Sequence, residues 1–161
     1  MEEKLKYIEN EISALGMQIT SDQAEKLLVY YGLLVEWNEK MNLTAITDFE
    51  AVVKKHFVDS LSIIYVKNMD DVDNLIDIGT GAGFPGIPLK IMFPHLKVTL
   101  LDSLRKRIDF LNHVVERLDL CELETVHGRS EDFAKPGVKR EKYDLCVSRA
   151  VADLAVLSEY C

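Results

Sequence analysis

The chain has 161 residues and a formal net charge of −8, and 48% of its residues are hydrophobic. This length suffices for one sizeable core, and the composition excludes a disordered or fibrous protein. No apolar run approaches the roughly 20 residues of a membrane span, and the charged start lacks the apolar core of a secretory signal, so we expect a cytoplasmic protein without membrane association. The acidic balance argues against nonspecific nucleic-acid binding. The cysteines lack metal-ligand spacing, so no metal site is expected.

Residues 1–68 are predicted to form an N-terminal helical cap, because apolar residues recur there at helical spacing. Thr20 and Gln23 form a capping-box pattern at the start of a second helix, and Thr47 with Glu50 forms another at the start of a third. The predicted apolar positions of the second helix are Ala24, Leu27, Leu28, Tyr31, Leu34 and Val35.

Residues 69–161 change to short apolar strands that alternate with helices. A strand, helix, strand order predicts a parallel α/β sheet with right-handed crossovers. We expect about four parallel strands in this second region. The predicted strands are residues 75–78, 98–101, 123–126 and 143–147, and a connecting helix is predicted over residues 104–118.

A glycine-rich turn lies between the first predicted strand and a helix. Counted from Gly79, the third glycine of a dinucleotide-binding GxGxxG motif would fall where Phe84 stands. The pattern is instead DxGxGxG, from Asp77 to Gly83. Glycines let the backbone approach a methionine moiety and a ribose closely, because they have no Cβ. The pattern therefore favours S-adenosylmethionine (SAM) as the cofactor, with Gly79, Gly81 and Gly83 as contacts.

Asp102 follows the second predicted strand, about twenty residues beyond the turn. An acid at this position is expected to accept hydrogen bonds from the ribose hydroxyls. The alternative is an ordinary tight loop that binds nothing. The register of strand, turn, helix, strand and acid favours the cofactor site.

Five separated motifs stand in order along nearly the whole chain. They are W-N at 37–38 with N-L-T at 42–44, H-F-V-D-S-L at 56–61, the glycine-rich segment 77–86, D-S at 102–103 with K-R at 106–107, and S-R-A-V-A at 148–152. Together they resemble the bacterial ribosomal RNA small subunit methyltransferase G family, also called glucose-inhibited division protein B. The resemblance implies a Rossmann-like SAM-dependent methyltransferase sheet. It also implies methylation of guanosine N7 in 16S ribosomal RNA, with that RNA or the ribosomal subunit as the partner.

The resemblance also assigns site residues position by position. It implies that Gly79 and Phe84 lie against SAM, and that Ser130 and Glu131 hold the adenine end through backbone groups. It further implies that Arg149, at the end of the fourth strand, reaches the cofactor or the incoming base. A surface salt bridge is the alternative for Arg149.

No catalytic residue is predicted, because guanine N7 carries a free lone pair and no proton that a base would have to remove. Alignment of the reacting atoms should supply most of the acceleration. His56 and Asp59 belong to one of the motifs and could contact the substrate. Equally, with Ser60 they could form a local hydrogen-bonded group that holds their helix on the sheet.

Methyltransferases of this class resemble one another in having seven strands, and only four are found here. We therefore expect an incomplete methyltransferase domain over residues 69–161. An open apolar edge at residues 145–147 would then favour self-association. Two other functions remain open: a SAM enzyme with another substrate, and a truncated SAM-binding fragment without activity.

Overall fold

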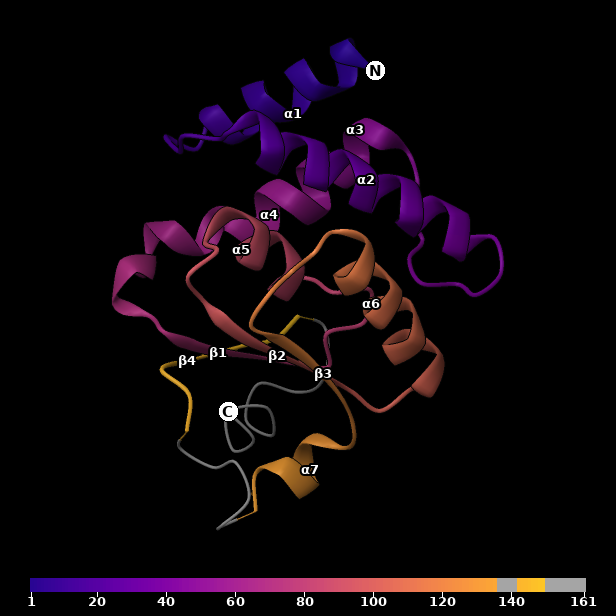
Figure 1. Cartoon of the computed structure of the whole chain (residues 1–161), viewed down its shortest axis with the longest axis vertical. Helices are drawn as coiled ribbons and strands as arrows, with labels where there is room; N and C mark the ends of the chain where they lie inside the picture. The colour runs from indigo at the N-terminus through magenta and orange to yellow at the C-terminus, as the bar shows by residue number, and fades with distance from the viewer. Residues whose placement is uncertain (136–141, 150–161) are drawn as a thin grey trace.

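The computed structural model describes residues 1–135 and 142–149, and its centre is a four-stranded parallel sheet (Figure 1). The predicted α/β sheet is confirmed. The last three residues of the S-R-A-V-A motif lie outside the described residues. The strands are β1 (Asn74–Ile78), β2 (Lys97–Asp102), β3 (Leu123–His127) and β4 (Leu145–Val147), in the spatial order β3-β2-β1-β4.

The register of the strands brings their carboxyl ends to one edge of the sheet. Ile78 in β1 pairs with Leu101 in β2, and Asp102 pairs with His127 in β3. On the other side of β1, Asp77 pairs with Val147 in β4. The segments that follow all four strands therefore emerge together, at the edge where open α/β sheets bind ligands.

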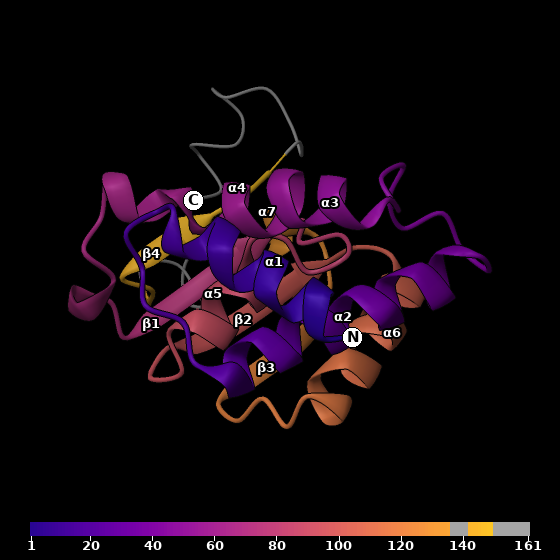
Figure 2. The same cartoon turned by 90° about the horizontal axis from the view of Figure 1, so that it is seen from above.

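Helices lie on both sides of the sheet. Helices α5 (Gly86–Met92) and α6 (Arg105–Arg117) cover one face, and the N-terminal helices stack over them (Figures 1 and 2). The short helix α7 (Ser130–Phe133) lies on the other side (Figure 1). The predicted helix over residues 104–118 is α6, and its buried residues recur at helical spacing.

The N-terminal region is helical, as predicted, but one of the two expected capping boxes is wrong. Thr20 and Gln23 exchange both hydrogen bonds of a capping box before α2. The third helix begins instead after Asp48, whose carboxylate accepts the Ala51 N–H at 2.9 Å. A carboxylate at this position also interacts favourably with the positive end of the helix. The elements are α1 (Glu2–Ser13), α2 (Ser21–Asn38), α3 (Phe49–Val52), the π-helical η1 (Val53–Val58), α4 (Asp59–Leu61), and the 3-10 turns η2 (Ser62–Tyr65) and η3 (Met69–Asp71).

Helix α2 buries a face rotated slightly from the predicted one. Tyr30 is fully buried, whereas Tyr31 is only half-buried and packs edge-on against Phe49. The helix contacts α1 on one side and the α5–α6 layer on another, so two faces of it carry apolar residues. Helical spacing alone did not distinguish these two faces.

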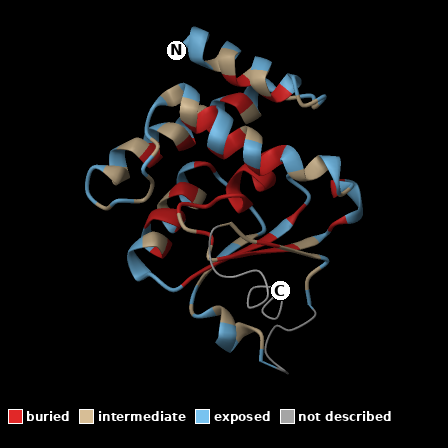
Figure 3. Ribbon diagram, turned by 180° about the vertical axis from the view of Figure 1, so that it is seen from behind, coloured by how far each residue is buried: buried red, intermediate tan, exposed pale blue. Residues whose placement is uncertain are grey.

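One hydrophobic core joins the cap to the sheet. It runs from Ile8 in α1 through Leu27 in α2 to Leu100 in β2 and Phe110 in α6, and the buried segments of Figure 3 trace it. A smaller cluster around Ile76 lies on the opposite face of the sheet. Within the described part of the chain, no helix could span a membrane and no set of side chains is arranged to hold a metal ion.

Candidate functional site

The glycine-rich turn follows β1 and has the backbone that its sequence requires. Gly79, Gly81 and Gly83 have φ angles of 65°, 62° and 98°, which side chains other than glycine rarely adopt. The Thr80 N–H donates to the Leu101 carbonyl of β2, and the Thr80 carbonyl in turn accepts the Gly83 N–H. The turn is therefore anchored to the neighbouring strand as well as to its own.

Asp77, the acid of the motif, ties the turn to the helix that follows it. Its Oδ2 accepts the Thr80 hydroxyl at 2.7 Å and the Gly86 N–H, at the start of α5, at 2.8 Å. The carboxyl group is fully buried, and its Oδ1 has no hydrogen-bond partner among the described residues. Burial raises the pKa of Asp77 to about 7 in spite of the two hydrogen bonds.

Asp102 lies at the carboxyl end of β2 with its carboxylate beside the turn. Oδ2 accepts the Gly81 N–H at 2.9 Å and a longer hydrogen bond from Arg107 at 3.4 Å, and Oδ1 accepts the Leu104 N–H at 2.9 Å. The residue is only 2% exposed. Since a carboxylate has about four acceptor positions and three are used, Asp102 can accept about one further hydrogen bond. The predicted acid is thus both an anchor of the turn and a wall of the adjacent cavity.

A cavity of about 230 Å³ opens at the carboxyl ends of β1, β2 and β3. It brings together four residues predicted from sequence, Gly79, Asp102, Ser130 and Glu131. We call it the cofactor pocket. Sequence analysis did not assign Ser103, Gly128 or Arg129 to the site, although Ser103 belongs to one of the five motifs and all three adjoin predicted residues. The complete lining is Ile78, Gly79, Leu101, Asp102, Ser103, Gly128, Arg129, Ser130 and Glu131.

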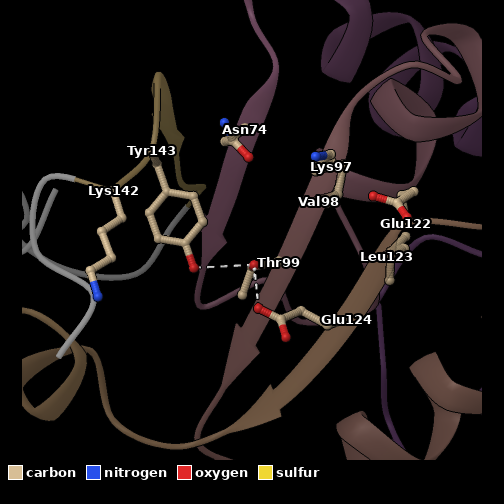
Figure 4. Close-up of a pocket in the computed structure, with 9 residues that line it drawn as sticks. All are labelled: Asn74, Lys97, Val98, Thr99, Glu122, Leu123, Glu124, Lys142 and Tyr143. Carbon is tan, nitrogen blue, oxygen red and sulfur yellow. Dashed lines mark hydrogen bonds between the residues drawn. The ribbon is translucent and has the colours of Figure 1, made fainter.

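A larger cavity of about 430 Å³ lies where β1, β2 and β3 begin, and Figure 4 shows its lining. Its central polar groups bond to one another, since the Tyr143 hydroxyl donates to Thr99 and Thr99 donates to Glu124 (Figure 4). The amino ends of parallel strands carry no glycine-rich turn here. Although it is smaller, the pocket at the carboxyl ends has the chemistry of a cofactor site.

His56 lies at the centre of a second group of functional candidates, beside Phe84 of the turn. The two rings stack with centroids 4.4 Å apart and an angle of 16° between them. The imidazole Nε2 lies 3.0 Å from the Thr44 hydroxyl, and Nδ1 lies 3.0 Å from the Arg149 guanidinium. Arg149 also forms an ion pair with Asp59 at 2.7 Å. We call these five residues the His56 cluster.

The hydrogen bonds of the His56 cluster define the state of the imidazole. A guanidinium has only donors, so Nδ1 must accept from Arg149, and the ring proton resides on Nε2 and is donated to Thr44. Burial, and next the positive charge of Arg149, lower the pKa of His56 to about 4. His56 is therefore neutral at physiological pH.

The His56 cluster explains why several separated motifs accompany the glycine turn. Asn38 accepts the N–H groups of Leu43 and Thr44, which positions Thr44 against His56. Ser60 donates to the carbonyl of His56 within the same helix. The structure thus contains the hydrogen-bonded group expected as one of the two alternatives.

Four of the predicted site residues do not line the cofactor pocket. Gly81 and Gly83 lie within the turn, Phe84 is buried under His56, and Arg149 faces His56 and Asp59. The side chain of Arg149 is 30% exposed and that of Asp59 is 57% exposed, so this ion pair is open to solvent. The salt bridge considered as the alternative for Arg149 is therefore present.

Comparison with known proteins gives a consistent result. A family model described as rRNA small subunit methyltransferase G, GidB, matches residues 23–161. Ribosomal RNA small subunit methyltransferase G of Lachnoclostridium phytofermentans is 54% identical over 150 residues, which are 93% of this chain and 62% of that protein. The proteins of the same name from Alkaliphilus metalliredigens and Acetivibrio thermocellus are 52% and 55% identical, over 100% and 92% of this chain and 67% and 61% of their own lengths.

The chain thus spans 61 to 67% of the length of these relatives. The matched region includes both the cofactor pocket and the His56 cluster. It also includes the five separated motifs. On this combined basis, the chain belongs to the ribosomal RNA small subunit methyltransferase G family.

Proposed function

We propose that the chain binds SAM in the cofactor pocket and carries the cofactor half of an enzyme that methylates guanosine N7 in 16S ribosomal RNA. The observation that carries the proposal is the meeting of the DxGxGxG turn with Asp102 and the first turn of α7 around one cavity. The relatives named above are ribosomal RNA methyltransferases by name, which supports the RNA substrate.

The residues of the pocket fit SAM. Next to the pocket, a Cβ added at Gly81 would have no atom within 4 Å, so this part of the turn leaves open space where a ligand can approach the backbone. Asp102 keeps acceptor capacity for a ribose hydroxyl. Ser130 and Glu131 start a helix, where backbone N–H groups have no partner within the helix and can donate to the adenine ring.

Bound SAM supplies an electrophilic methyl group on a sulfonium. The protein's task is then to align guanine N7 with that methyl group, since the N7 lone pair needs no general base. Methylation leaves positive charge on the guanine ring, so a nearby carboxylate favours the transition state. Asp59 is the exposed carboxylate of the His56 cluster, and its ion pair with Arg149 would have to open for it to take this role.

We place the acceptor base next to Arg149. Arg149 directly follows Ser148, whose hydroxyl donates to the Ile78 carbonyl at the end of β1, so the His56 cluster adjoins the strand that leads into the turn. Lys54 and Lys55 are exposed on the same helical segment as His56 and provide positive charge for RNA phosphates. If His56→Ala abolished methylation while SAM affinity and melting temperature were unchanged, His56 would be a substrate contact. If the variant melted at a lower temperature than wild type, the role of His56 would be structural.

Three further proposals concern the whole protein. We take residues 1–68 as the part that shapes the RNA site and residues 69–161 as the SAM-binding part, although both share one core. An RNA substrate in the small ribosomal subunit implies a cytoplasmic location. We also expect self-association through β4, which pairs with β1 at the end of the described sheet. Sedimentation that shows only monomer at high concentration would contradict the last proposal.

Two assays test the proposed function. Calorimetry with SAM measures cofactor binding by the 161-residue chain, and transfer of labelled methyl from SAM to small-subunit ribosomal RNA, followed by detection of 7-methylguanosine, measures the reaction. We expect binding in the first assay. Binding with transfer to another substrate would support a SAM enzyme of different specificity, and binding without any transfer would support a SAM-binding fragment.

A further inference from the structure

Tyr30 connects the N-terminal helix α2 to the glycine turn. Its side chain is fully buried, and its ring stacks on Phe57 with centroids 5.7 Å apart and lies 5.3 Å from Phe84. The Tyr30 hydroxyl donates a hydrogen bond to the carbonyl of Ala82, in the middle of the turn. A Cβ added at Gly83 would lie only 2.8 Å from the same hydroxyl. Tyr30 therefore fills the space against Ala82 and Gly83.

Several other hydrogen bonds hold the turn from the sheet region. Gly81 is held by Asp102, and Thr80 is held by Asp77 and by the Leu101 carbonyl. The Ala82 carbonyl is held instead by a side chain that lies 52 positions earlier in the chain. The turn is thus held by hydrogen bonds from two separate parts of the molecule, the sheet region and helix α2.

The hydrogen bond from Tyr30 to Ala82 restrains a flexible part of the turn. The peptide between Ala82 and Gly83 adjoins a glycine at φ 98°, and glycine adopts several backbone conformations at little cost. The N–H of this peptide donates to the Thr80 carbonyl within the turn, and Tyr30 adds a hydrogen bond to its carbonyl from outside the turn. Burial, and next the negative charge of Asp77, raise the pKa of Tyr30, so its hydroxyl keeps its proton and remains a donor.

We propose that Tyr30 is a positioning residue of the cofactor site, which fixes the Ala82 carbonyl and thereby holds the turn in the shape that binds SAM. The ring alone would fill the space, and the hydroxyl sets the orientation of the peptide. The identity of the ligand rests on the proposed function, whereas the effect on the turn does not.

The chain contains a matched control for this inference. Tyr31 is the next residue of α2, and its hydroxyl also donates to a backbone carbonyl, that of Thr47, away from the turn. Tyr30→Phe and Tyr31→Phe each remove one hydroxyl and one hydrogen bond to a carbonyl. They differ in which backbone segment loses its partner, and the hydrogen bond of Tyr30 is buried whereas that of Tyr31 is exposed.

The experiment compares wild type and both variants by hydrogen exchange without ligand and by calorimetry with SAM and with adenosine. We expect Tyr30→Phe to accelerate exchange at residues 80–84 and to weaken SAM binding roughly tenfold, because the buried Ala82 carbonyl loses its hydrogen bond from Tyr30. Adenosine, which lacks the methionine moiety near the turn, should be affected less. Tyr31→Phe should leave the turn and SAM affinity unchanged.

Two results would overturn the inference. One is a hydrogen-exchange rate at residues 80–84 that is the same in Tyr30→Phe, Tyr31→Phe and wild type. The other is equal SAM affinity in all three proteins. A wild-type chain that bound no SAM would contradict the proposed function instead, and the exchange data would still decide whether Tyr30 fixes the turn.

Discussion

The cofactor pocket and the His56 cluster lie on the same glycine turn but are built differently. The pocket is open and presents backbone groups, glycines and one buried carboxylate that retains acceptor capacity. The His56 cluster consists of side chains that already contact one another, and its Arg149–Asp59 ion pair is open to solvent. The difference suggests that the pocket receives a ligand, whereas the cluster holds the turn and offers one charged edge to a second molecule.

The same substitution at two glycines should show this difference most strongly. At Gly83, a Cβ would lie 2.5 Å from Ile87 and 2.8 Å from Tyr30, in addition to the strain of a positive φ. Gly83→Ala should therefore lower the free energy of unfolding by about 3 kcal/mol or more. At Gly81 a Cβ would enter open space, so Gly81→Ala should lower the free energy of unfolding by only about 1 kcal/mol, because of the positive φ. Urea unfolding measures both losses. Equal losses of stability in Gly83→Ala and Gly81→Ala would contradict the statement that the turn is packed at Gly83 and open at Gly81.

The pH dependence of stability separates Asp77 from His56. The pKa of Asp77 is raised to about 7, so the folded chain binds one more proton than the unfolded chain between about pH 4 and pH 7. Its contribution to stability is present at low pH and is lost as the pH rises toward 7. The stability difference between wild type and Asp77→Asn should favour wild type more at pH 5 than at pH 8, by about 3 kcal/mol.

His56 should show the opposite sign. Its pKa is lowered to about 4, so below about pH 6.5 the unfolded chain binds a proton that the folded chain does not. Relative to His56→Gln, wild type should lose stability as the pH falls from 6.5 to 4, by up to on the order of 3 kcal/mol. The measurement is the free energy of unfolding from pH 4 to 8 for wild type, Asp77→Asn and His56→Gln. If the difference between wild type and each variant changed in the same direction with pH, the pKa shift assigned to Asp77 or to His56 would be wrong.

Much of the fold could be predicted from sequence, and the reasons are local. Strand and helix periodicity located β1, β2, β3 and α6, and the glycine pattern with Asp102 located the pocket. Tyr30 could not be found in this way, because helical spacing fits Tyr31 equally well and only packing against Phe57 and Phe84 selects between them. The bonds of Arg149 to His56 and Asp59 join positions about 90 residues apart, which no local pattern specifies.

The smallest effect is expected at the adenine end of the pocket. Ser130 and Glu131 are proposed to act through backbone N–H groups, so Ser130→Ala should change SAM affinity less than about twofold. Ser130→Pro, in contrast, removes the N–H group itself and should weaken binding clearly. Calorimetry checks both variants, and a large loss in Ser130→Ala would show that the hydroxyl contacts the ligand.

Calorimetric titration of SAM into the wild-type chain and into Asp102→Ala tests the central claim most directly, with circular dichroism to verify that both are folded. Asp102 lines the pocket and holds Gly81, so its loss removes both the ribose acceptor and an anchor of the turn. We predict saturable one-to-one binding by wild type and a loss of at least roughly tenfold in affinity in Asp102→Ala. Folded wild type that binds no SAM, or equal affinity in the two proteins, would contradict the assignment of the cofactor pocket.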